Sequence, residues 1–253
     1  MRSCAELEII PVPLADEIRP GDSLLEKLLS ALSHPKRRLR GGDILVLKHK
    51  IVSKAEGQLV TLNSIRPSRN SRAWARRYCL DARVTELALA QSRSVLRRRR
   101  GVLITETSHG FICANSGVDV SNVDGGGKAL LLPKDADRSA AELHRALKKT
   151  LRLSIPVIIS DSFGRPWREG LTEVAIGVAG MKALHDYRRR RDPHGYLLRV
   201  SVEAVADELA CAAGLVCGKL ARVPVSIVRG FRYRPGRGSA RDLIRPAAAD
   251  LFR

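Results

Sequence analysis

Residues 157–170, VIISDSFGRPWREG, combine the pattern of a buried strand with an unusual group of polar residues. The β-branched run at 157–159 predicts a strand in the interior of a sheet. Asp161 stands at the expected end of this strand and is followed by Ser162 and then by glycines and arginines. Because a strand fixes the position of the loop after it, and glycine lets a ligand approach the backbone, Asp161 is a candidate site residue.

The segments on either side of this stretch alternate between strand and helix patterns, without a regular βαβ order or an internal repeat. Periodicity and capping residues predict helices at 22–32, 135–150 and 207–219, and a helical region over roughly 69–98. Strands are expected near the start in LEIIPVP and at 43–49, 102–107, 111–114, 155–160, 196–206 and 223–230. These patterns predict a mixed α+β protein. Residues 1–253 are treated as one unit, and a division into two subdomains stays open because composition places no boundary.

The net charge of +19 and the pI near 10.6 are high for a chain of 253 residues and predict an anionic partner. Nucleic acid, an acidic surface and a multiply charged small substrate all fit this charge. The five cysteines are scattered and form no C-x-x-C pair, which argues against a zinc site or a disulfide framework. No apolar run approaches the length of a membrane span and no secretory leader is evident, so we expect a soluble cytoplasmic protein without a membrane partner.

Three expected loops carry oxygen and nitrogen ligands just after predicted strands. The candidates are Asp119 and Asn122 in SGVDVSNVDGGG, Asp161 and Ser162 in the opening stretch, and His49, Lys50 and Lys54 in HKIVSKAEG. An aspartate from each of two loops together with a hydroxyl oxygen suits Mg²⁺ or Mn²⁺ that holds a phosphate, and lysines add point charges. A single aspartate after a strand is more commonly a turn residue, so the residues alone leave both interpretations open.

Other conspicuous residues are better explained without chemistry. The GGGK at 125–128 is no P-loop, because Asn122 occupies the first glycine position and Ala129 follows the lysine. Cys113 is predicted in the core and His109 in a hairpin turn. The arginine runs at 97–100 and 188–191 are the best argument for nucleic acid, yet they lack interleaved aromatic residues and a known binding motif. A solvated face is the favoured interpretation of both runs.

Five long motifs occur in one order: GDILVLKHKIVSKAEG, HGFICANSGVDVSNV, SDSFGRPWREGLTEVAIGVAG, EAVADELACAAGLVCGK and VPVSIVRG. Together they resemble the coenzyme F420-0:L-glutamate ligase family over nearly the whole chain. The resemblance implies a GTP-dependent ligase that joins L-glutamate to coenzyme F420-0 by an amide bond and then adds further γ-linked glutamates. Such an enzyme works through an acyl phosphate and releases GDP and phosphate. The resemblance also implies an intertwined homodimer, a ligase fold without a P-loop, two divalent ions (Mg²⁺ or Mn²⁺) and K⁺ as a further candidate ion.

The resemblance assigns roles to particular residues. Asp119 and Asp161 match metal ligands, and Ser162 occupies a position where a threonine helps to hold a second metal. Asp161 and Lys54 match catalytic positions. The residues that match nucleotide-contacting positions are Ala15, Asp16, Glu17, Ile18, His49, Lys50, Lys54, Asn122, Cys217, Gly218 and Lys219. Arg165, Trp167 and Arg168 are expected on the side of the acidic substrate.

One position departs from the family pattern. Lys219 stands where some relatives carry a glutamate that binds metal, and its segment is one residue shorter. We interpret the lysine as a replacement for the charge of a cation. Two alternatives to the main prediction remain: a related nucleotide-dependent amide ligase with another carboxylate acceptor, and a basic nucleic-acid-binding protein that has kept the fold but lost the chemistry. The main prediction expects GTP, L-glutamate and coenzyme F420-0 as partners and no nucleic acid.

Overall fold

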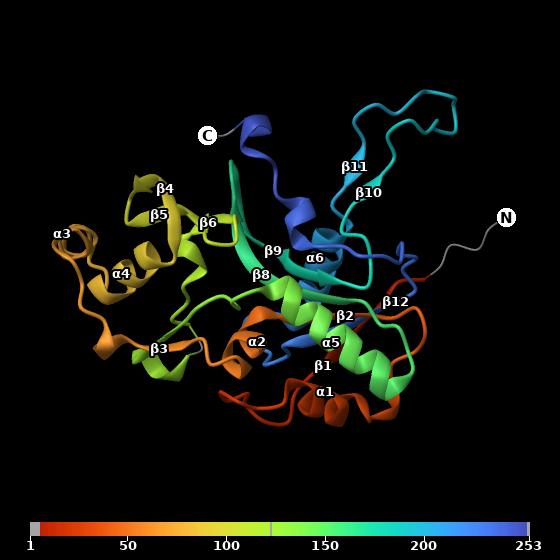
Figure 1. The fold of residues 1–253 in the computed structure, drawn as a ribbon, viewed down its shortest axis with the longest axis horizontal. Coiled ribbons are helices and arrows are strands. Elements are labelled where there is room, and N and C mark those ends of the chain that lie inside the picture. Colours follow the sequence, from red (N-terminus) through yellow and green to blue (C-terminus); the bar gives the residue numbers. More distant parts are fainter. Residues whose placement is uncertain (1–5, 122, 252–253) are drawn as a thin grey trace.

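The computed structural model describes residues 6–121 and 123–251, and its centre is a five-stranded sheet with the order β1-β12-β2-β8-β9 (Figure 1). The strands are β1 (Glu8–Val12), β12 (Val225–Arg229), β2 (Ile44–Lys48), β8 (Val157–Arg165) and β9 (Arg168–Ala179). Strands β2 and β8 pair in parallel, whereas the other neighbours pair antiparallel. Helices and sheets together confirm the predicted α+β class.

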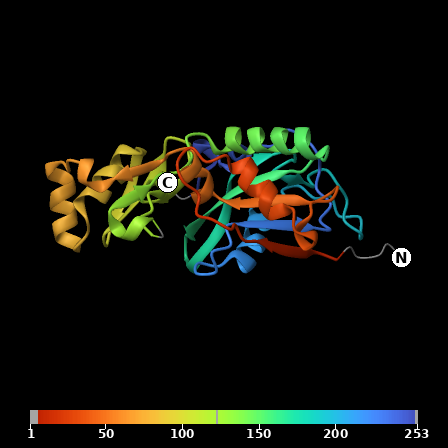
Figure 2. The same cartoon turned by 90° about the horizontal axis from the view of Figure 1, so that it is seen from below.

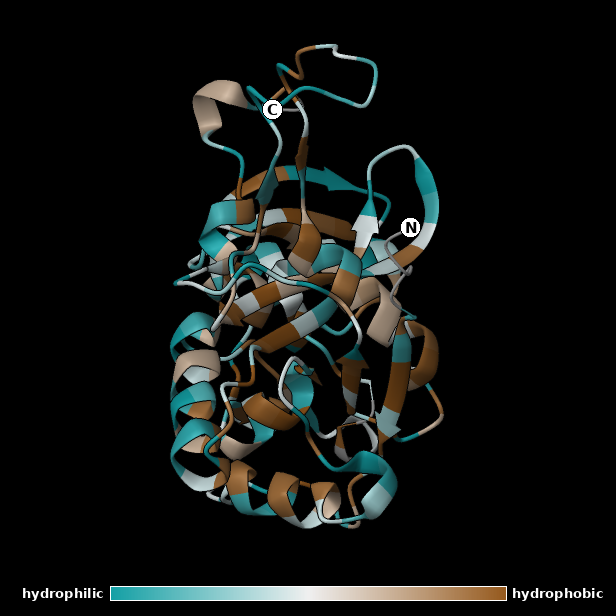
Figure 3. Ribbon diagram, turned by 90° about the vertical axis from the view of Figure 1, so that its right-hand side faces the viewer, coloured by the Kyte–Doolittle hydropathy of each residue, from teal (hydrophilic) through white to brown (hydrophobic). Residues whose placement is uncertain are grey.

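Helices cover both faces of this sheet. Helix α5 (Ala136–Leu151) lies on one face with α1 (Leu24–Leu32) and α2 (His49–Ala55), and α6 (Val205–Cys217) lies on the other (Figure 2). The hydrophobic residues gather on the central strands, while the outward sides of the helices are more hydrophilic (Figure 3). No helix in the described part of the chain is both long enough and apolar enough to cross a membrane.

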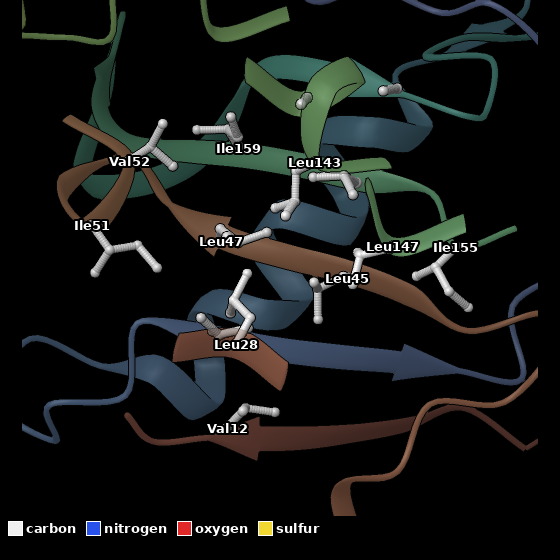
Figure 4. Close-up of a cluster of buried hydrophobic side chains, with 14 of the residues drawn as sticks. Val12, Leu28, Leu45, Leu47, Ile51, Val52, Leu143, Leu147, Ile155 and Ile159 are labelled. Carbon is white, nitrogen blue, oxygen red and sulfur yellow. The ribbon is translucent and has the colours of Figure 1, made fainter. Parts of the chain in front are cut away.

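The alternation of β2 explains why both faces are covered. Leu45 and Leu47 point into the cluster beneath α1 and α5, which Figure 4 shows in close-up, and Ile44 and Val46 point into the cluster beneath α6. All four side chains are buried. Successive strand residues face opposite sides, so a strand that is apolar throughout requires cover on both. Each such side chain contributes about 1.5–3 kcal/mol when it leaves water.

A smaller lobe at one end of the molecule is built from the middle of the chain (Figure 1). Its elements are β3 (Leu59–Thr61), α3 (Arg69–Tyr78), α4 (Ala82–Ala90), β4 (Ser92–Arg99), β5 (Val102–Thr107), β6 (Ile112–Ala114) and β7 (Lys128–Leu130). A separate cluster around Leu62, Leu87 and Ala129 forms its core. The hairpin predicted at 102–107 and 111–114 is confirmed. Whether this lobe is a subdomain in its own right stays a prediction.

The expected helical region over 69–98 is only partly correct. Helix α3 ends where Cys79 adopts a left-handed conformation (φ 54°), and α4 begins at the cap Asp81, whose side chain accepts the Arg83 amide. Residues 92–99 form strand β4 instead, because they pair with β5 across a tight turn at Arg100 and Gly101. This pairing outweighs the helix propensity of the leucine and the arginines.

Two strand predictions also need correction. The strand expected at 196–206 shrinks to β11 (Val202–Glu203), which pairs with β10 (His185–Asp186), and helix α6 already begins at Val205. Strand β8 does not end before Asp161 but continues to Arg165, because β9 pairs with it along this whole length. A register shift between Ile159 and Ser160 marks the change from the buried half of β8 to its polar half. The remaining helices and the strands at 43–49 and 223–230 are confirmed within two residues.

Candidate active site

Strands β2 and β8 leave the hydrophobic core side by side at one end of the sheet, which is called its edge below. Two predicted residues, His49 and Asp161, come together there. Strand β2 passes directly into α2 at His49, and Lys48 is in register with Ser160 on β8. The His49 Nε2 atom therefore lies 3.3 Å from Asp161 Oδ1, while His49 Nδ1 lies 3.2 Å from the hydroxyl of Ser53. The His49 side chain is 2% exposed and that of Asp161 15% exposed. The imidazole thus faces the carboxylate in a nearly closed corner, although its buried Nε2 atom forms no hydrogen bond there.

Asp119 reaches the same edge from the smaller lobe. Its backbone is anchored by two hydrogen bonds with Leu130, from Asp119 N to Leu130 O (3.0 Å) and from Leu130 N to Asp119 O (2.8 Å). Its carboxylate accepts the Ser121 amide at 2.6 Å and forms an ion pair with Lys50 Nζ at 2.6 Å. Lys50 also donates to the Ser121 hydroxyl and carbonyl, both at 3.0 Å. One turn of α2 thus presents His49 to one carboxylate and Lys50 to the other.

Both carboxylates are held in the ionised form. Burial alone would raise the pKa of Asp161, but the adjacent His49 and the Ser162 amide outweigh it and leave that pKa below its ordinary value. Burial would also raise the pKa of Asp119, but its bonds with Lys50 and Ser121 outweigh burial and leave that pKa below its ordinary value. The negative charge of Asp119 raises the pKa of Asp161 and so opposes this lowering. The edge therefore carries two mutually repelling negative charges at neutral pH, which a cation would stabilise.

Lys54, one turn further along α2, lies beside the predicted nucleotide loop. Its Nζ atom is 2.6 Å from Glu17 Oε1. Glu17, Ile18 and Lys54 line a cavity of about 330 Å³ together with Arg19, Pro20, Leu59, Val123 and Lys128. Asp16 turns instead to Lys27 on α1 at 3.2 Å, and Ala15 is exposed. The predicted residue Asn122 lies outside the described residues, although its neighbour Val123 lines this cavity.

Ser162 is held by Lys219 and by Glu173, a residue that sequence analysis did not single out. Its hydroxyl donates to Glu173 Oε1 at 2.6 Å and accepts from Lys219 Nζ at 3.1 Å. Glu173 also contacts Lys48 Nζ at 2.5 Å. Glu173 was missed because it belongs to this group only through the β8–β9 hairpin, where it lies directly opposite Ser162. An expected strand that stopped at 160 carried no signal of that pairing.

The model of the F420-0:Gamma-glutamyl ligase family matches residues 14–230 of the chain. The chain belongs to this family. It is 41% identical to the coenzyme F420:L-glutamate ligase of Methanopyrus kandleri, with 98% of each chain covered. It is 42% identical to the protein of the same name from Methanothermobacter thermautotrophicus, over 92% of this chain and 93% of that one. For the Methanocaldococcus jannaschii protein of that name the identity is 40%, over 85% and 86%.

Family membership confirms the resemblance and the prediction of a ligase. The segment that the family model matches contains every candidate residue described above. The geometry also limits the kind of metal site this member can form. Among the described residues, no group of three or more histidine, cysteine, aspartate or glutamate side chains converges as a metal site would require. Any metal held by Asp119 and Asp161 would therefore need water, hydroxyl or phosphate oxygens as its other ligands, which is the coordination that Mg²⁺ prefers.

The segment expected to cradle the nucleotide begins where α6 ends. Gly218 terminates the helix with a positive φ of 55°, and its amide donates to Gly214 O at 3.1 Å. The thiol of Cys217 points inward and lies 3.0 Å from the hydroxyl of Ser226, and burial raises its pKa. Cys217 could thus contact a nucleotide only through its backbone. The predicted contacts of Cys217, Gly218 and Lys219 with a nucleotide stay predictions.

The residues set aside by sequence analysis lie as expected. His109 stands in the β5–β6 turn, where its Nε2 atom lies 3.0 Å from Lys134 O. The arginine run at 97–100 belongs to the smaller lobe, and the run at 188–191 follows β10 at the other end of the molecule (Figure 1). The two runs therefore form no common surface. Arg165 ends β8 and Arg168 begins β9, and Trp167 lies in the turn between them, where it is 81% exposed.

Cys113 is buried on β6, whereas Cys79 is exposed. Burial, with a contribution from the charge of Asp161, raises the pKa of the Cys113 thiol to about 12. We expect iodoacetamide at neutral pH to alkylate Cys79 in the native protein and to leave Cys113 unmodified, because only the thiolate reacts. Peptide mass spectrometry before and after unfolding in guanidinium measures this difference. Equal labelling of the two cysteines in the native protein would contradict the buried position of Cys113.

Proposed function

We propose that this protein is a GTP-dependent ligase that joins L-glutamate to coenzyme F420-0 and then adds further γ-linked glutamates. The observation that carries the proposal is the convergence of Asp119 and Asp161 with His49 and Lys50 at one edge of the sheet, and Lys54 one turn further along α2, within a chain that belongs to the ligase family. The names of the curated relatives supply the substrates. The acceptor carboxylate would attack the γ-phosphorus and release GDP. The glutamate amine would then attack the acyl carbon, lose a proton and release phosphate.

A divalent ion, Mg²⁺ or Mn²⁺, fits the pair Asp119 and Asp161. Both carboxylates are ionised and partly accessible, and Lys50, which now pairs with Asp119, would turn to the phosphates when the ion binds. When bound, the ion would neutralise the charge that develops on the phosphoryl oxygens. The other work falls to side chains of this protein. Lys50 and Lys54 would screen the phosphates as point charges, and His49 would keep Asp161 oriented.

The cavity beside Lys54 is the proposed position of the nucleotide. Its volume of about 330 Å³ lies at the lower end of the range for ligand pockets. Glu17 and Ile18 form one wall, so the loop at 15–18 would pack against GTP, and Lys54 would exchange Glu17 for a phosphate. Arg165 and Arg168 would favour the acidic substrates at the hairpin. Because GTP is an intracellular metabolite, we place the reaction in the cytoplasm, and we propose a homodimer, with K⁺ as a further ion.

A product assay tests this function. The purified protein is incubated with coenzyme F420-0, L-glutamate, GTP and Mn²⁺, and the products are analysed by mass spectrometry. We expect a mass increase of one or more glutamyl units, matched by the release of GDP and phosphate, and no product when EDTA is present. Replacement of GTP by ATP measures the nucleotide preference.

The outcomes separate the alternatives. GTP binding without glutamylated product would overturn the proposed acceptor and favour a related amide ligase with another carboxylate substrate. Absence of both binding and product would overturn the ligase function. The nucleic-acid alternative then predicts binding to an oligonucleotide that weakens steeply with salt and with replacement of the arginines at 97–100.

A further inference from the structure

Two lysines meet a group of oxygen atoms on the β8–β9 hairpin, close to the proposed metal site. Glu173, whose side chain is 11% exposed, accepts hydrogen bonds from the Ser162 hydroxyl at 2.6 Å and from the Ser160 hydroxyl at 2.9 Å. Lys48 Nζ lies 2.5 Å from Glu173 Oε1, and Lys219 Nζ donates to Ser162 Oγ at 3.1 Å. These five residues come from three separate segments, so only the fold assembles them.

The bonding around Ser162 leaves its oxygen free to face a cation. A hydroxyl has one proton, and this one is given to Glu173, so the lone pairs of the oxygen point away from that carboxylate. A hydroxyl and a carboxylate are hard oxygen ligands of the kind that Mg²⁺ and Mn²⁺ prefer. In this chain the ammonium group of Lys219 already occupies the cation position at Ser162, and that of Lys48 occupies the one at Glu173.

A second divalent ion does not fit this arrangement. At Ser162 it would stand beside the ammonium group of Lys219, and like charges at such short distance repel strongly. Lys48 Nζ already neutralises the Glu173 carboxylate, so that carboxylate brings no unpaired negative charge to a second ion. The expected pair of ions therefore reduces to one, and Ser162 becomes the partner of Lys219 rather than a ligand of a second metal.

We infer that this ligase uses a single divalent ion per chain, held at Asp119 and Asp161, and that the ammonium of Lys219 replaces the second ion and contacts the phosphates of the nucleotide. The inference rests on the proposed function and specifies its cofactor. Glu173 is then a positioning residue, because it acts on the phosphates only through Ser162 and Lys48. Lysine suits this task because its ammonium group is a compact charge with three donors.

The stoichiometry of Mn²⁺ binding tests the inference. We expect isothermal titration of the full chain, saturated with GDP, to show one Mn²⁺ per chain for the wild type. Lys219→Glu removes the ammonium and adds a carboxylate beside Ser162 and Glu173, so we expect two Mn²⁺ per chain. Lys149→Glu makes the same charge change on the exposed last turn of α5 and should leave the stoichiometry at one.

A second variant tests the contact with phosphate. Lys219→Gln keeps a polar side chain that is only one atom shorter and removes its charge, so we expect the dissociation constant of GDP to rise about tenfold while the Mn²⁺ stoichiometry stays at one. Circular dichroism spectra that match the wild type show that each variant is folded. Two Mn²⁺ per wild-type chain, or an unchanged stoichiometry in Lys219→Glu, would overturn the inference, as would unaltered GDP affinity in Lys219→Gln.

These results are separable from the test of the proposed function, because metal and GDP binding need no acceptor substrate. A wild type that makes glutamylated product and binds two Mn²⁺ would overturn the single-ion inference alone. A wild type that binds one Mn²⁺ and makes no product would overturn the proposed reaction alone.

Discussion

Asp161→Asn is expected to lower the rate of glutamyl transfer by about 10²–10³-fold, the usual loss when an electrostatic contact to the transition state is removed. Asparagine keeps the shape of the side chain but brings no charge to the corner beside His49. The loss should therefore appear in Mn²⁺ affinity as well as in turnover. Single-turnover product formation by mass spectrometry, together with an Mn²⁺ titration, measures both effects.

Asp186→Asn is the matched control. Asp186 lies on β10, and its carboxylate pairs with the exposed Arg188 at 2.6 Å, away from the sheet edge that carries Asp161. The control variant should retain the wild-type rate and the wild-type Mn²⁺ affinity. If Asp161→Asn behaves in the same way as this control, the proposed metal site is wrong.

Asp43→Ala is expected to lower the free energy of unfolding by about 3–5 kcal/mol, the typical cost of breaking a buried ion pair. Asp43 is 1% exposed and binds Arg229 through two bonds of 2.9 Å, one from Nε and one from Nη2. It also accepts the Arg40 amide at 2.7 Å. The substitution would leave the guanidinium of Arg229 without its buried partner and would loosen the junction of β2 with β12. Urea unfolding followed by circular dichroism gives the free-energy difference.

The chain offers a close comparison in Asp186→Ala. Asp186 and Arg188 form the same forked contact, with bonds from Nε at 2.9 and 3.0 Å and from Nη2 at 2.6 Å, but at the exposed end of β10. Solvent and salt screen an exposed pair, so its removal should change the unfolding midpoint far less. Equal effects of the two substitutions would show that burial is not what makes the Asp43–Arg229 pair important.

The elements that sequence analysis predicted correctly are those whose signals are local. Helix α5 carries an aspartate cap and an apolar stripe, and β2 and β12 are short apolar runs bounded by turn residues. Strand β4 escaped prediction because its eight residues contain four arginines and pair irregularly, with two register shifts against β5. Only the presence of β5 beside it makes that segment a strand.

The residues of the candidate site also differ in whether a local sequence signal could find them. Asp119, Asp161, His49, Lys50 and Lys54 were predicted from their positions after strands and from the family motifs. The structure then explains how α2, which starts directly at the end of β2, turns successive residues toward both carboxylates. The carboxylate of Glu173 had no sequence signal, because its partners, Lys48 on β2 and Ser160 and Ser162 on β8, lie on other strands.

The order of motifs along the chain therefore identifies the family, and hydrophobic periodicity identifies most of the elements, since both depend on residues close together in sequence. Which cation each oxygen contacts depends on the pairing of β8 with β9 and on the return of the chain after α6. These contacts join residues far apart in sequence. Their geometry follows from the packing of the two apolar faces of the sheet, which no single segment specifies.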